Sequence, residues 1–339
     1  MKAIVWQGER DIKYTDIPEP QPEKGQVKLK VLACGFCVTE YHIITGKIDI
    51  CKPPHVLGHE ICGKIVAVGD GVEKEIIGRR TVVETYVGCD KCEYCKSGKK
   101  HLCDAGEIGY PPYNGGEAEY VVVPKKCIHF LPDEISDDEA GIMEAAACPF
   151  GAIMENNVKD KSVLIYGAGV AGLSFIQAAK IYGAKKVLCV VRNDVKKDQA
   201  YHFGADIVID TRTEDVSDRI KEETDGYGAD FFIDATGAPK IIEQGFTFVK
   251  RGGKIILYGI PEKDTKVNLP VFDVILNQIS LCGYTGNSSA WEEIIKQVKD
   301  GKFNLKDMIT LRLPLKETKK AIETLDKKPK DMIKIVLKP

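Results

Sequence analysis

The sequence contains no long apolar run. None of its segments approaches the roughly 18 consecutive apolar residues that a membrane-spanning helix requires. Its first residues, MKAIVWQGERDIKY, include an apolar run of only four residues, which is too short for the core of a secretory signal peptide. These absences predict a cytoplasmic protein that has no membrane partner.

The sequence also lacks an excess of charge of either sign. The formal net charge is -2 and the pI is about 6.4, and acidic and basic residues are interspersed along the chain. A domain that binds nucleic acid would need a basic patch. We therefore expect no nucleic acid among the partners of this protein.

Internal repeats and low-complexity linkers are absent as well. A length of 339 residues favours two domains, and the 44% hydrophobic and 29% charged fractions are those of ordinary globular proteins. Cysteine, in contrast, is abundant, with 12 residues. Because the chain is neither small nor visibly secreted, we expect reduced cysteines that serve as metal ligands or core residues rather than as disulfides.

Short, β-branched apolar runs recur through the second half of the sequence. Amphipathic or Ala-rich segments such as GLSFIQAAKIYG separate most of these runs. Continuous apolar runs are typical of parallel strands buried on both faces, and alternation with helices is typical of a doubly wound α/β sheet. The six strands of such a sheet are expected at residues 162–166, 186–191, 206–210, 230–235, 254–259 and 279–284.

The first half of the sequence has a different pattern. The segments QVKLKVLACG, CGKIVAVG and AEYVVVP are strand-like and bounded by Gly or Pro, with little helical periodicity before about residue 136. We expect a mostly β domain there. A helix should follow over SDDEAGIMEAAACPFGAIMENN, with Ser136 as its N-cap and Glu139 completing a capping box. The expected domain boundary lies near residue 150.

A glycine-rich motif follows the first of the expected parallel strands. The segment YGAGVAG places Gly167, Gly169 and Gly172 in the G-x-G-x-x-G pattern, between a strand and a helix. In that setting the first glycine permits a tight turn, the second lets a pyrophosphate approach the backbone, and the third lets the helix pack closely on the strand. The helix N-terminus supplies amide donors for the anion. The motif therefore predicts a dinucleotide-binding site.

The end of the second strand indicates which dinucleotide binds. NAD-binding units usually place Asp or Glu there, where it holds the ribose 2′-hydroxyl. This sequence has Val191 followed by Arg192, and a guanidinium can bind a 2′-phosphate. We therefore favour NADP(H) over NAD(H). Asp194 keeps the NAD alternative open, because a shifted strand end would bring its carboxylate to the ribose.

Four cysteines lie close together in the first half of the sequence. The pattern is C-x2-C-x2-C-x7-C, made by Cys89, Cys92, Cys95 and Cys103. Bacterial ferredoxins begin similarly, but their final gap is shorter and Pro follows it, whereas Asp104 follows here. Four thiolates in a Gly- and Lys-rich loop are typical of a closed, tetrahedral zinc site, which leaves no open position for a substrate. The cluster therefore predicts a structural zinc site.

A second set of possible metal ligands is spread over two segments, CGFCVTEYH and LGHEICG. Its members are Cys34, Cys37, His42, His59, Glu60 and Cys62. Each of these residues could equally be a core residue when it is considered alone.

Together these motifs resemble the zinc-dependent medium-chain dehydrogenase/reductase family, of the alcohol, polyol and threonine dehydrogenase type. The matching segments, which span essentially the whole chain, are ACGFCVTEYH, GHE, the four-cysteine segment, GGEAEYVVVP, YGAGVAG and GGKIILYGI. The resemblance implies a GroES-like, mostly β catalytic domain at residues 1–150 that residues 286–339 complete. It also implies that residues 151–285 form a Rossmann domain that binds NADP.

By the same resemblance, the second set of ligands would hold a catalytic zinc ion, so that each chain would hold two zinc ions. Cys37 and His59 would be ligands, and Glu60 would be a ligand that can exchange with substrate or water. The remaining ligand differs between subfamilies. The segment IMEAAACPF offers both Glu144 and Cys148 for that place, and we favour Glu144.

The resemblance assigns further residues. Thr39 and His42 match the proton-relay positions of the family. Glu40 stands where the family usually has Asp as the partner of the zinc-bound His, and a longer carboxylate could alter how the metal is held. The candidate cofactor-binding residues are Gly167, Gly169, Val170, Gly172, Arg192, Asn193, Lys196, Thr236, Gly259, Ile260, Tyr284 and Thr285.

The predicted activity is hydride transfer between a secondary alcohol and NADP(H), which interconverts alcohol and ketone. A homo-dimer or homo-tetramer is expected, and the loop GYPPYNGG points to a polyol-like substrate. The alternatives within the family are an NAD-dependent polyol or threonine dehydrogenase and a hydroxysteroid dehydrogenase. An inactive binding protein of the same fold is disfavoured by the intact set of zinc ligands, and a nucleic-acid-binding zinc ribbon is disfavoured by the net charge.

Overall fold

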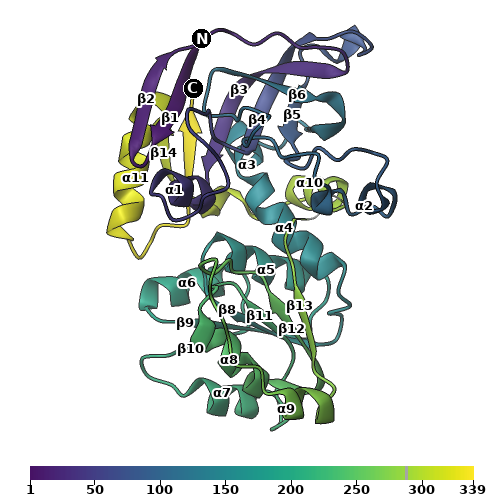
Figure 1. The fold of residues 1–339 in the computed structure, drawn as a ribbon. Helices are drawn as coiled ribbons and strands as arrows, with labels where there is room; N and C mark the ends of the chain where they lie inside the picture. Colours follow the sequence, from purple (N-terminus) through teal and green to yellow (C-terminus); the bar gives the residue numbers. More distant parts are fainter. Residues whose placement is uncertain (287–288) are drawn as a thin grey trace. The chain divides into compact units, whose positions relative to one another are not determined.

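The computed structural model describes residues 1–286 and 289–339. Its contacts divide the chain into two compact units (Figure 1). The first unit comprises Met1–Ala147 and Gly286–Pro339, and the second unit comprises Cys148–Thr285. The first unit is therefore built from two segments that the whole second unit separates in sequence.

The second unit contains a parallel sheet whose strand order is β10-β9-β8-β11-β12-β13. Its strands are β8 (Ser162–Tyr166), β9 (Lys186–Val191), β10 (Ile207–Asp210), β11 (Ala229–Asp234), β12 (Val249–Leu257) and β13 (Ser280–Gly283). The order reverses between β8 and β11, as in a Rossmann fold. The predicted doubly wound sheet is therefore confirmed, although β12 begins at Val249 rather than at residue 254.

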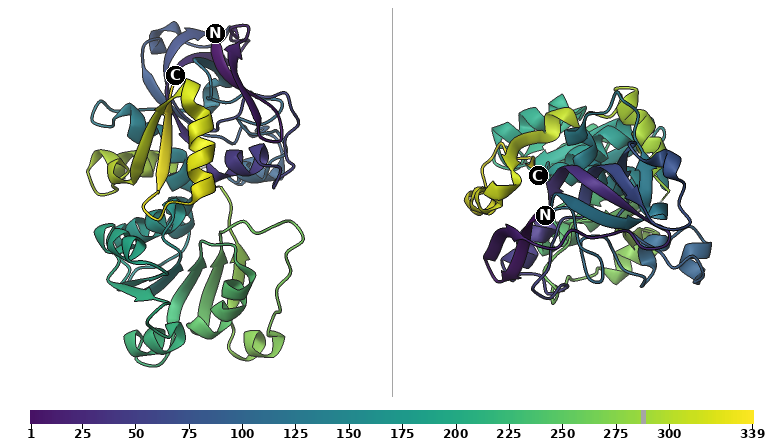
Figure 2. Two further views of the ribbon diagram at one scale, coloured as in Figure 1. Left: turned by 90° about the vertical axis from the view of Figure 1, so that its left-hand side faces the viewer. Right: turned by 90° about the horizontal axis from the view of Figure 1, so that it is seen from above.

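The helices of the second unit are α5 (Val170–Ile181), α6 (Asp194–His202), α7 (Val216–Glu223), α8 (Pro239–Phe248) and α9 (Val271–Leu276). Helix α5 contacts α6, and α7 contacts α8. Right-handed crossovers that wind in opposite directions from β8 place these two pairs on opposite faces of the sheet. Both faces are therefore covered, as Figure 2 shows, and the strands between them are continuously apolar.

The first unit is mostly β. It contains the hairpin β1-β2 and a larger sheet of order β14-β15-β3-β4-β5-β7, with β6 paired to β3. Its strands are β1 (Lys2–Gly8), β2 (Asp11–Asp16), β3 (Gln26–Phe36), β4 (Glu60–Val68), β5 (Arg80–Val83), β6 (Tyr120–Pro124), β7 (Ile128–Phe130), β14 (Ile309–Pro314) and β15 (Lys334–Lys338). The C-terminal strands thus complete the sheet of the first unit through the antiparallel pair β15-β3.

Helices of the first unit are short. They are α1 (Val38–Ile44), α2 (Glu93–Lys96), α3 (Asp137–Gly141), α10 (Trp291–Lys299) and α11 (Thr318–Lys327), with 3-10 turns η1 (Lys74–Ile76), η2 (Lys100–Leu102), η3 (Lys125–Cys127), η4 (Lys306–Met308) and η5 (Leu315–Glu317). Helix α1 was not expected from the sequence. Helix α4 (Met143–Met154) crosses the boundary between the two units.

The helix expected to begin after Ser136 is interrupted. Ser136 and Glu139 form the predicted capping box, but α3 ends at Gly141 and α4 begins at Met143. A Cβ at Gly141 would lie 2.8 Å from Ala33 Cβ, so the chain passes very close to β3 at this point. The expectation of one continuous helix was wrong, because this tertiary contact ends the first helix after five residues.

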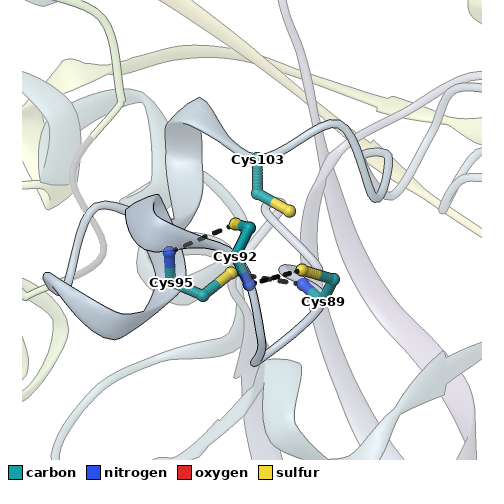
Figure 3. Close-up of side chains that lie close together, drawn as sticks. All are labelled: Cys89, Cys92, Cys95 and Cys103. Carbon is teal, nitrogen blue, oxygen red and sulfur yellow. Dashed lines mark hydrogen bonds between the residues drawn. The ribbon is translucent and has the colours of Figure 1, made fainter.

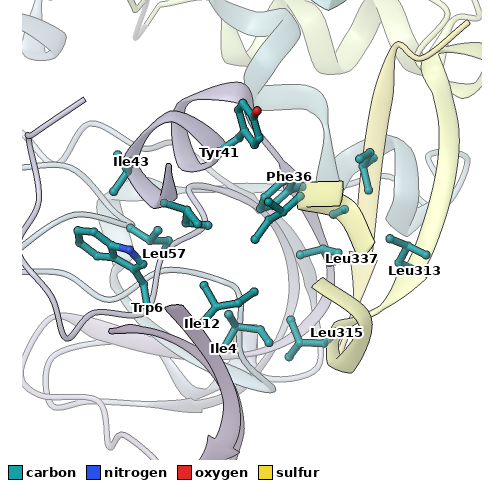
Figure 4. Packing of buried hydrophobic residues seen from close by; sticks show 14 of the residues in the cluster. Ile4, Trp6, Ile12, Phe36, Tyr41, Ile43, Leu57, Leu313, Leu315 and Leu337 are labelled. Carbon is teal, nitrogen blue, oxygen red and sulfur yellow. The ribbon is translucent and has the colours of Figure 1, made fainter. Parts of the chain in front are cut away.

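A buried apolar cluster joins the two segments of the first unit. Figure 4 shows Ile4 and Trp6 from β1 and Phe36 from β3 in one cluster with Leu315 and Leu337 from the C-terminal segment. Burying a side chain of this size stabilises a protein by about 1.5–3 kcal/mol. These contacts hold the C-terminal segment on the N-terminal one.

Candidate metal centres and nucleotide site

The structure brings the four clustered cysteines together in one loop region (Figure 3). The sulfur atoms of Cys89, Cys92, Cys95 and Cys103 all lie within 4.8 Å of one another. Cys92 is the N-cap of α2, so the turn of this short helix places Cys95 beside it. All twelve cysteines of the chain are free of disulfides.

This cluster fits a zinc ion. Zinc–sulfur bonds of about 2.3 Å in a tetrahedron place sulfur atoms roughly 3.8 Å apart, which agrees with the observed grouping. Backbone N–H groups of Cys89, Cys92 and Cys95 donate to sulfur atoms of the same cluster at 3.2–3.4 Å. Backbone N–H donors of Lys91 and Cys92 lower the pKa of Cys89 to about 6, whereas desolvation and the neighbouring cysteines raise the pKa of Cys92 to about 11. Such donors stabilise the thiolates that zinc requires.

A second cluster forms where β3 leads into α1 and where β4 begins. Ligand atoms of Cys37, His59 and Glu60 lie within 4.8 Å of one another. Cys37 is the N-cap of α1, and Gly35 pairs with Glu60 across the β3-β4 ladder. The antiparallel register therefore aligns two segments that are separated by more than twenty residues of chain.

Glu40 orients the imidazole of His59. One Glu40 oxygen is hydrogen-bonded to His59 Nδ1, and the other accepts from the backbone N–H of Cys37 at 3.0 Å. The hydroxyl of Tyr110 lies 3.0 Å from the same His59 Nδ1. Nε2 of His59 is thereby directed to the cluster, where a Glu144 carboxylate oxygen lies 3.5 Å away. The longer carboxylate of Glu40 thus still reaches the histidine, as a partner of a metal-bound histidine must.

The acidic donors of this cluster fit a divalent cation. Glu144 is buried, and burial raises its pKa to about 7. Glu40 and Glu60 are also fully buried, and Oε2 of Glu60 has no hydrogen-bond partner in the part of the chain that the structure describes. A metal ion would supply both the missing partner and the missing positive charge. The first unit itself brings Glu144 to His59, whereas Cys148 belongs to the second unit.

The second oxygen of Glu60 is engaged by Lys334. This lysine lies at the start of β15, is only 3% exposed, and forms an ion pair with Glu60 Oε1. A side chain at Gly35 would collide with Glu60 Oε2, so the glycine leaves the space that this carboxylate occupies. One carboxylate oxygen of Glu60, Oε1, therefore accepts a hydrogen bond from Lys334. The other, Oε2, has no hydrogen-bond partner among the described residues.

The two proposed relay residues lie on α1. The Cys37 sulfur lies 3.6 Å from Thr39 Oγ1. His42 is three residues further along the same helix, so the two side chains share one face. Burial lowers the pKa of His42, with Lys47 and Lys328 acting in the same direction. The imidazole is therefore neutral near pH 7.

The glycine motif forms a tight turn between β8 and α5. Gly167 has a φ of +105°, which favours glycine. A Cβ at Gly172 would collide with the Gly167 carbonyl oxygen, whereas a Cβ at Gly169 would meet no atom within 4 Å. Gly169 is the N-cap of α5 without a side-chain cap, and Val170 begins the helix. This turn, open above Gly169 and followed by uncapped N–H groups, fits a pyrophosphate.

The other candidate cofactor residues follow strands of the same sheet. Arg192 and Asn193 follow β9, and Asn193 caps α6 by accepting from the Lys196 N–H at 2.9 Å. The remaining candidates follow the carboxyl ends of β11, β12 and β13 and are Thr236, Gly259, Ile260, Tyr284 and Thr285. In a parallel sheet these ends share one edge, so the candidates and the glycine turn lie along that edge.

Two protein-family models match the chain. The alcohol dehydrogenase GroES-like domain matches residues 23–133, and the zinc-binding dehydrogenase model matches residues 171–300. The chain belongs to the zinc-dependent medium-chain dehydrogenase/reductase family. As a member, this medium-chain dehydrogenase is a zinc-dependent oxidoreductase with a nicotinamide dinucleotide as cofactor.

Similar proteins act on several alcohols. The chain is 35% identical to L-threonine 3-dehydrogenase of Pyrococcus horikoshii over 300 residues, which are 87% of this chain and 85% of the relative. It is 32% identical to sorbitol dehydrogenase of Halalkalibacterium halodurans over 346 residues, with 100% and 99% covered. The structure of 2R,3R-butanediol dehydrogenase from Bacillus subtilis is similar, with a TM-score of 0.91, 28% identity, and 100% and 99% of the chains covered.

Sequence reasoning missed two residues that the structure of this medium-chain dehydrogenase places beside candidate site residues. Lys334 contacts Glu60, and Arg212 contacts Asp194. It considered Tyr110 only as a residue lining the substrate pocket, whereas the Tyr110 hydroxyl contacts His59. The one available signal for Lys334 was a lysine between isoleucines in an apolar segment, DMIKIVL.

None of the helices among residues 1–286 and 289–339 is long and apolar enough to cross a bilayer.

Proposed function

We propose that this dehydrogenase oxidises a secondary alcohol to a ketone with NADP+, and catalyses the reverse reaction, in the cytoplasm. The observation that carries this proposal is the cluster of Cys37, His59 and Glu60, with Glu144 beside His59. Such a set of thiolate, imidazole and carboxylate donors suits a zinc ion. We assign one catalytic zinc to this cluster and one structural zinc to the four cysteines.

Each residue of the catalytic cluster has a distinct task. A bound zinc ion supplies Lewis-acid activation of the substrate hydroxyl. Cys37, His59 and Glu144 would hold the metal, and the hydrogen bond from Glu40 fixes the tautomer of His59. Glu60, held on one side by Lys334, would leave or take the remaining position as substrate enters or leaves.

Thr39 and His42 would remove the hydroxyl proton. Thr39 Oγ1 lies near the Cys37 sulfur and can accept a proton from a substrate hydroxyl while donating its own. His42, which is neutral near pH 7 because burial lowers its pKa, can take up that proton. Its half-buried position on α1 allows subsequent release to solvent.

The second unit would bind the dinucleotide across the glycine turn and the carboxyl ends of its strands. The preference for NADP(H) is supported by Arg192 after β9 and by the absence of a carboxylate at Val191. Asp194, the residue that would favour NAD, is paired with Arg212 at 2.6 Å. An ion-paired carboxylate is a weaker acceptor for a ribose hydroxyl than a free one.

The substrate class we propose is a secondary alcohol with a neighbouring polar group. The support comes from the relatives named for threonine, sorbitol and 2R,3R-butanediol, all of which have such a hydroxyl. Phe36 and Tyr41, two aromatic residues near the cluster, are used for packing, since Phe36 is in the core and the Tyr41 hydroxyl donates to Asp326 at 2.8 Å.

We further propose that the chain forms a homo-dimer through the exposed edge of the second unit. Strand β13 is the last strand of the sheet, and none of the residues of α9 is buried. Val271, Phe272, Ile275 and Leu276 on α9 and Leu281 on β13 are all exposed apolar side chains. An edge strand beside an apolar patch suits a two-fold contact with a second copy, which would extend the sheet.

The test is turnover of the zinc-loaded protein, followed by absorbance at 340 nm. NADP+ and NAD+ are offered separately against sorbitol, 2,3-butanediol, L-threonine, simple secondary alcohols and hydroxysteroids. We expect reduction of NADP+ with a vicinal diol or polyol. Turnover with NAD+ alone would establish the NAD-dependent alternative instead. Cys37→Ser should abolish turnover, whereas the matched variant Cys282→Ser, in β13, should retain it.

A further inference from the structure

We propose that Arg212 determines the preference of the nucleotide site for a 2′-phosphate, by engaging the Asp194 carboxylate and by offering unused N–H donors beside Arg192. This inference rests on the proposed use of NADP(H). Arg212 is not part of the glycine motif or of the β9 end. It follows β10, the neighbouring strand.

The ends of β9 and β10 lie side by side. Val191 pairs with Asp210 in the parallel register, and the N–H of Thr211 donates to the Val191 carbonyl at 3.0 Å. The segment after β10 therefore runs beside the segment after β9, which contains Arg192 and Asp194. This adjacency allows a residue from the third βα turn to act at the ribose end of the nucleotide site.

Two edges of the Arg212 guanidinium are already used. Nε lies 3.0 and 3.2 Å from the Asp210 oxygens, and Nη2 lies 2.5 Å from Asp210 and 2.6 Å from Asp194. Asp210 is nearly buried, whereas Asp194 is 78% exposed. One cation thus links a fixed acidic residue to a solvent-exposed one.

The Nη1 amino group of the guanidinium is available. Within the part of the chain that the structure describes, Nη1 makes no hydrogen bond or ion pair, and the Arg212 side chain is 44% exposed. Nη1 carries two of the five N–H donors of an arginine, and these can bind phosphate oxygens. Arg192 is also exposed and lies two residues before Asp194. The two arginines can therefore bind one phosphate group together.

Pairing Asp194 with Arg212 has a second effect. A free carboxylate at this place would repel a 2′-phosphate and would accept a hydrogen bond from an unphosphorylated ribose. The Arg212 guanidinium lies against the Asp194 carboxylate and offsets part of its negative field. Arg212 therefore favours a 2′-phosphate in two ways. Its guanidinium attracts the phosphate, and its ion pair with Asp194 weakens the repulsion between that carboxylate and the phosphate.

Binding experiments on the full chain separate these effects from catalysis. Adenosine 2′,5′-bisphosphate and adenosine 5′-monophosphate differ only in the 2′-phosphate, and isothermal titration calorimetry measures both affinities. For Arg212→Gln we expect an affinity for the bisphosphate that is about ten- to a hundredfold lower, as loss of a charge-assisted contact predicts, with monophosphate affinity unchanged or higher. Arg192→Gln should likewise lower the affinity for the bisphosphate.

A double variant distinguishes attraction from shielding. In the double variant Arg212→Gln with Asp194→Asn, the Asp194 carboxylate that Arg212→Gln leaves unpaired is also removed. The affinity for the bisphosphate that was lost through repulsion should then be recovered. The affinity lost with the direct Arg212 contact should not be recovered. The matched control is Arg219→Gln on α7, because Arg219 pairs only with Glu214, Glu222 and Glu223 among the described residues. This control should bind both probes as the wild-type protein does.

Two results would overturn the inference. If Arg212→Gln binds the bisphosphate as well as wild type, or loses both probes equally, the guanidinium only links the two loops. If NADP(H) is not the preferred cofactor, the wild-type protein itself would bind the two probes equally and would turn over with NAD+. That result is distinct from the two above. A wild-type preference for the bisphosphate that survives Arg212→Gln contradicts only the role of Arg212.

Discussion

Glu117 is a buried acid whose carboxylate has no hydrogen-bond partner among residues 1–286 and 289–339. It is fully buried, neither carboxylate oxygen has a hydrogen bond within the described residues, and a Cβ at Gly58 would meet both Glu117 and Cys34 at 2.9 Å. Burial, with a smaller contribution from Glu40, raises its pKa well above the ordinary value of 4.5. The native protein therefore holds a proton that the unfolded chain releases.

This state predicts how stability depends on pH. The contribution of Glu117 is fully present below pH 4.5 and is lost as pH rises toward the folded pKa, by about 1.4 kcal/mol per pH unit. Glu117→Gln should remove this slope. Thermal melting of both proteins between pH 5 and 8 measures it, with exposed Glu134→Gln as the control. Parallel melting profiles for wild type and Glu117→Gln would mean that the native carboxyl is ionised.

Lys334 neutralises Glu60 in the interior of the first unit. Both side chains are nearly fully buried. Removal of one partner leaves an uncompensated buried charge, which costs about 3–5 kcal/mol. Lys334→Met should therefore lower the melting temperature strongly, and adding Glu60→Gln should restore much of it.

The matched control for that experiment is Lys338→Met. Lys338 lies on the same strand and pairs with Asp138, but its side chain is 40% exposed, so its pair should contribute about 1 kcal/mol or less. Equal melting temperatures for Lys334→Met and Lys338→Met would contradict a buried ion pair at Glu60. Lys334→Arg, which keeps the charge, should be less destabilised than Lys334→Met.

At the scale of elements, the proposed structural zinc site predicts how the cysteine loop responds to loss of one ligand. The segment from Gly88 to Cys103 contains only α2 and η2 and has no buried residues in either helix. We therefore expect the structural zinc ion proposed for the four cysteines to contribute much of its order. Cys95→Ser should lower the zinc content from two ions per chain to one and should lower the melting temperature. Metal analysis of the purified variant tests this, and Cys282→Ser should retain both ions.

The glycine turn before α5 allows a second prediction at this scale. Gly169→Ala places a methyl where no atom lies within 4 Å, so the protein should fold with unchanged melting temperature. The methyl would stand where the pyrophosphate should approach, and nucleotide affinity should fall at least about tenfold. Gly172→Ala, in contrast, should destabilise the unit because its methyl meets the Gly167 carbonyl. Unaltered nucleotide binding by Gly169→Ala would place the ligand elsewhere.

At the scale of the whole molecule, the exposed edge of the second unit predicts the oligomeric state. Phe272→Glu and Leu281→Glu each introduce a charge into the proposed two-fold contact, where it would lie opposite its own copy. Both variants should be monomeric by size-exclusion chromatography with light scattering, while wild type is dimeric. Tyr227→Glu changes another exposed aromatic of the same unit and should leave the dimer intact. A wild-type monomer would contradict the interface.

Features encoded locally were predictable. Apolar runs predicted the strands of the parallel sheet, glycine spacing predicted the turn before α5, and the spacing of Cys89 to Cys103 predicted a cluster that the fold brings together. Helix α1 was not predicted, since its seven residues are too few to show a helical period. The split between α3 and α4 was also missed, because it depends on the approach of Gly141 to Ala33.

The sequence by itself indicated the family, the parallel sheet, the glycine turn and the four-cysteine cluster, since each depends on residues close in the chain or on motifs with fixed spacing. Only the tertiary structure decided which partners those residues have. Lys334 reaches Glu60 across 274 positions, and Arg212 reaches Asp194 from the next strand. Such contacts follow from strand pairing and burial, which bring distant residues together without leaving a local pattern.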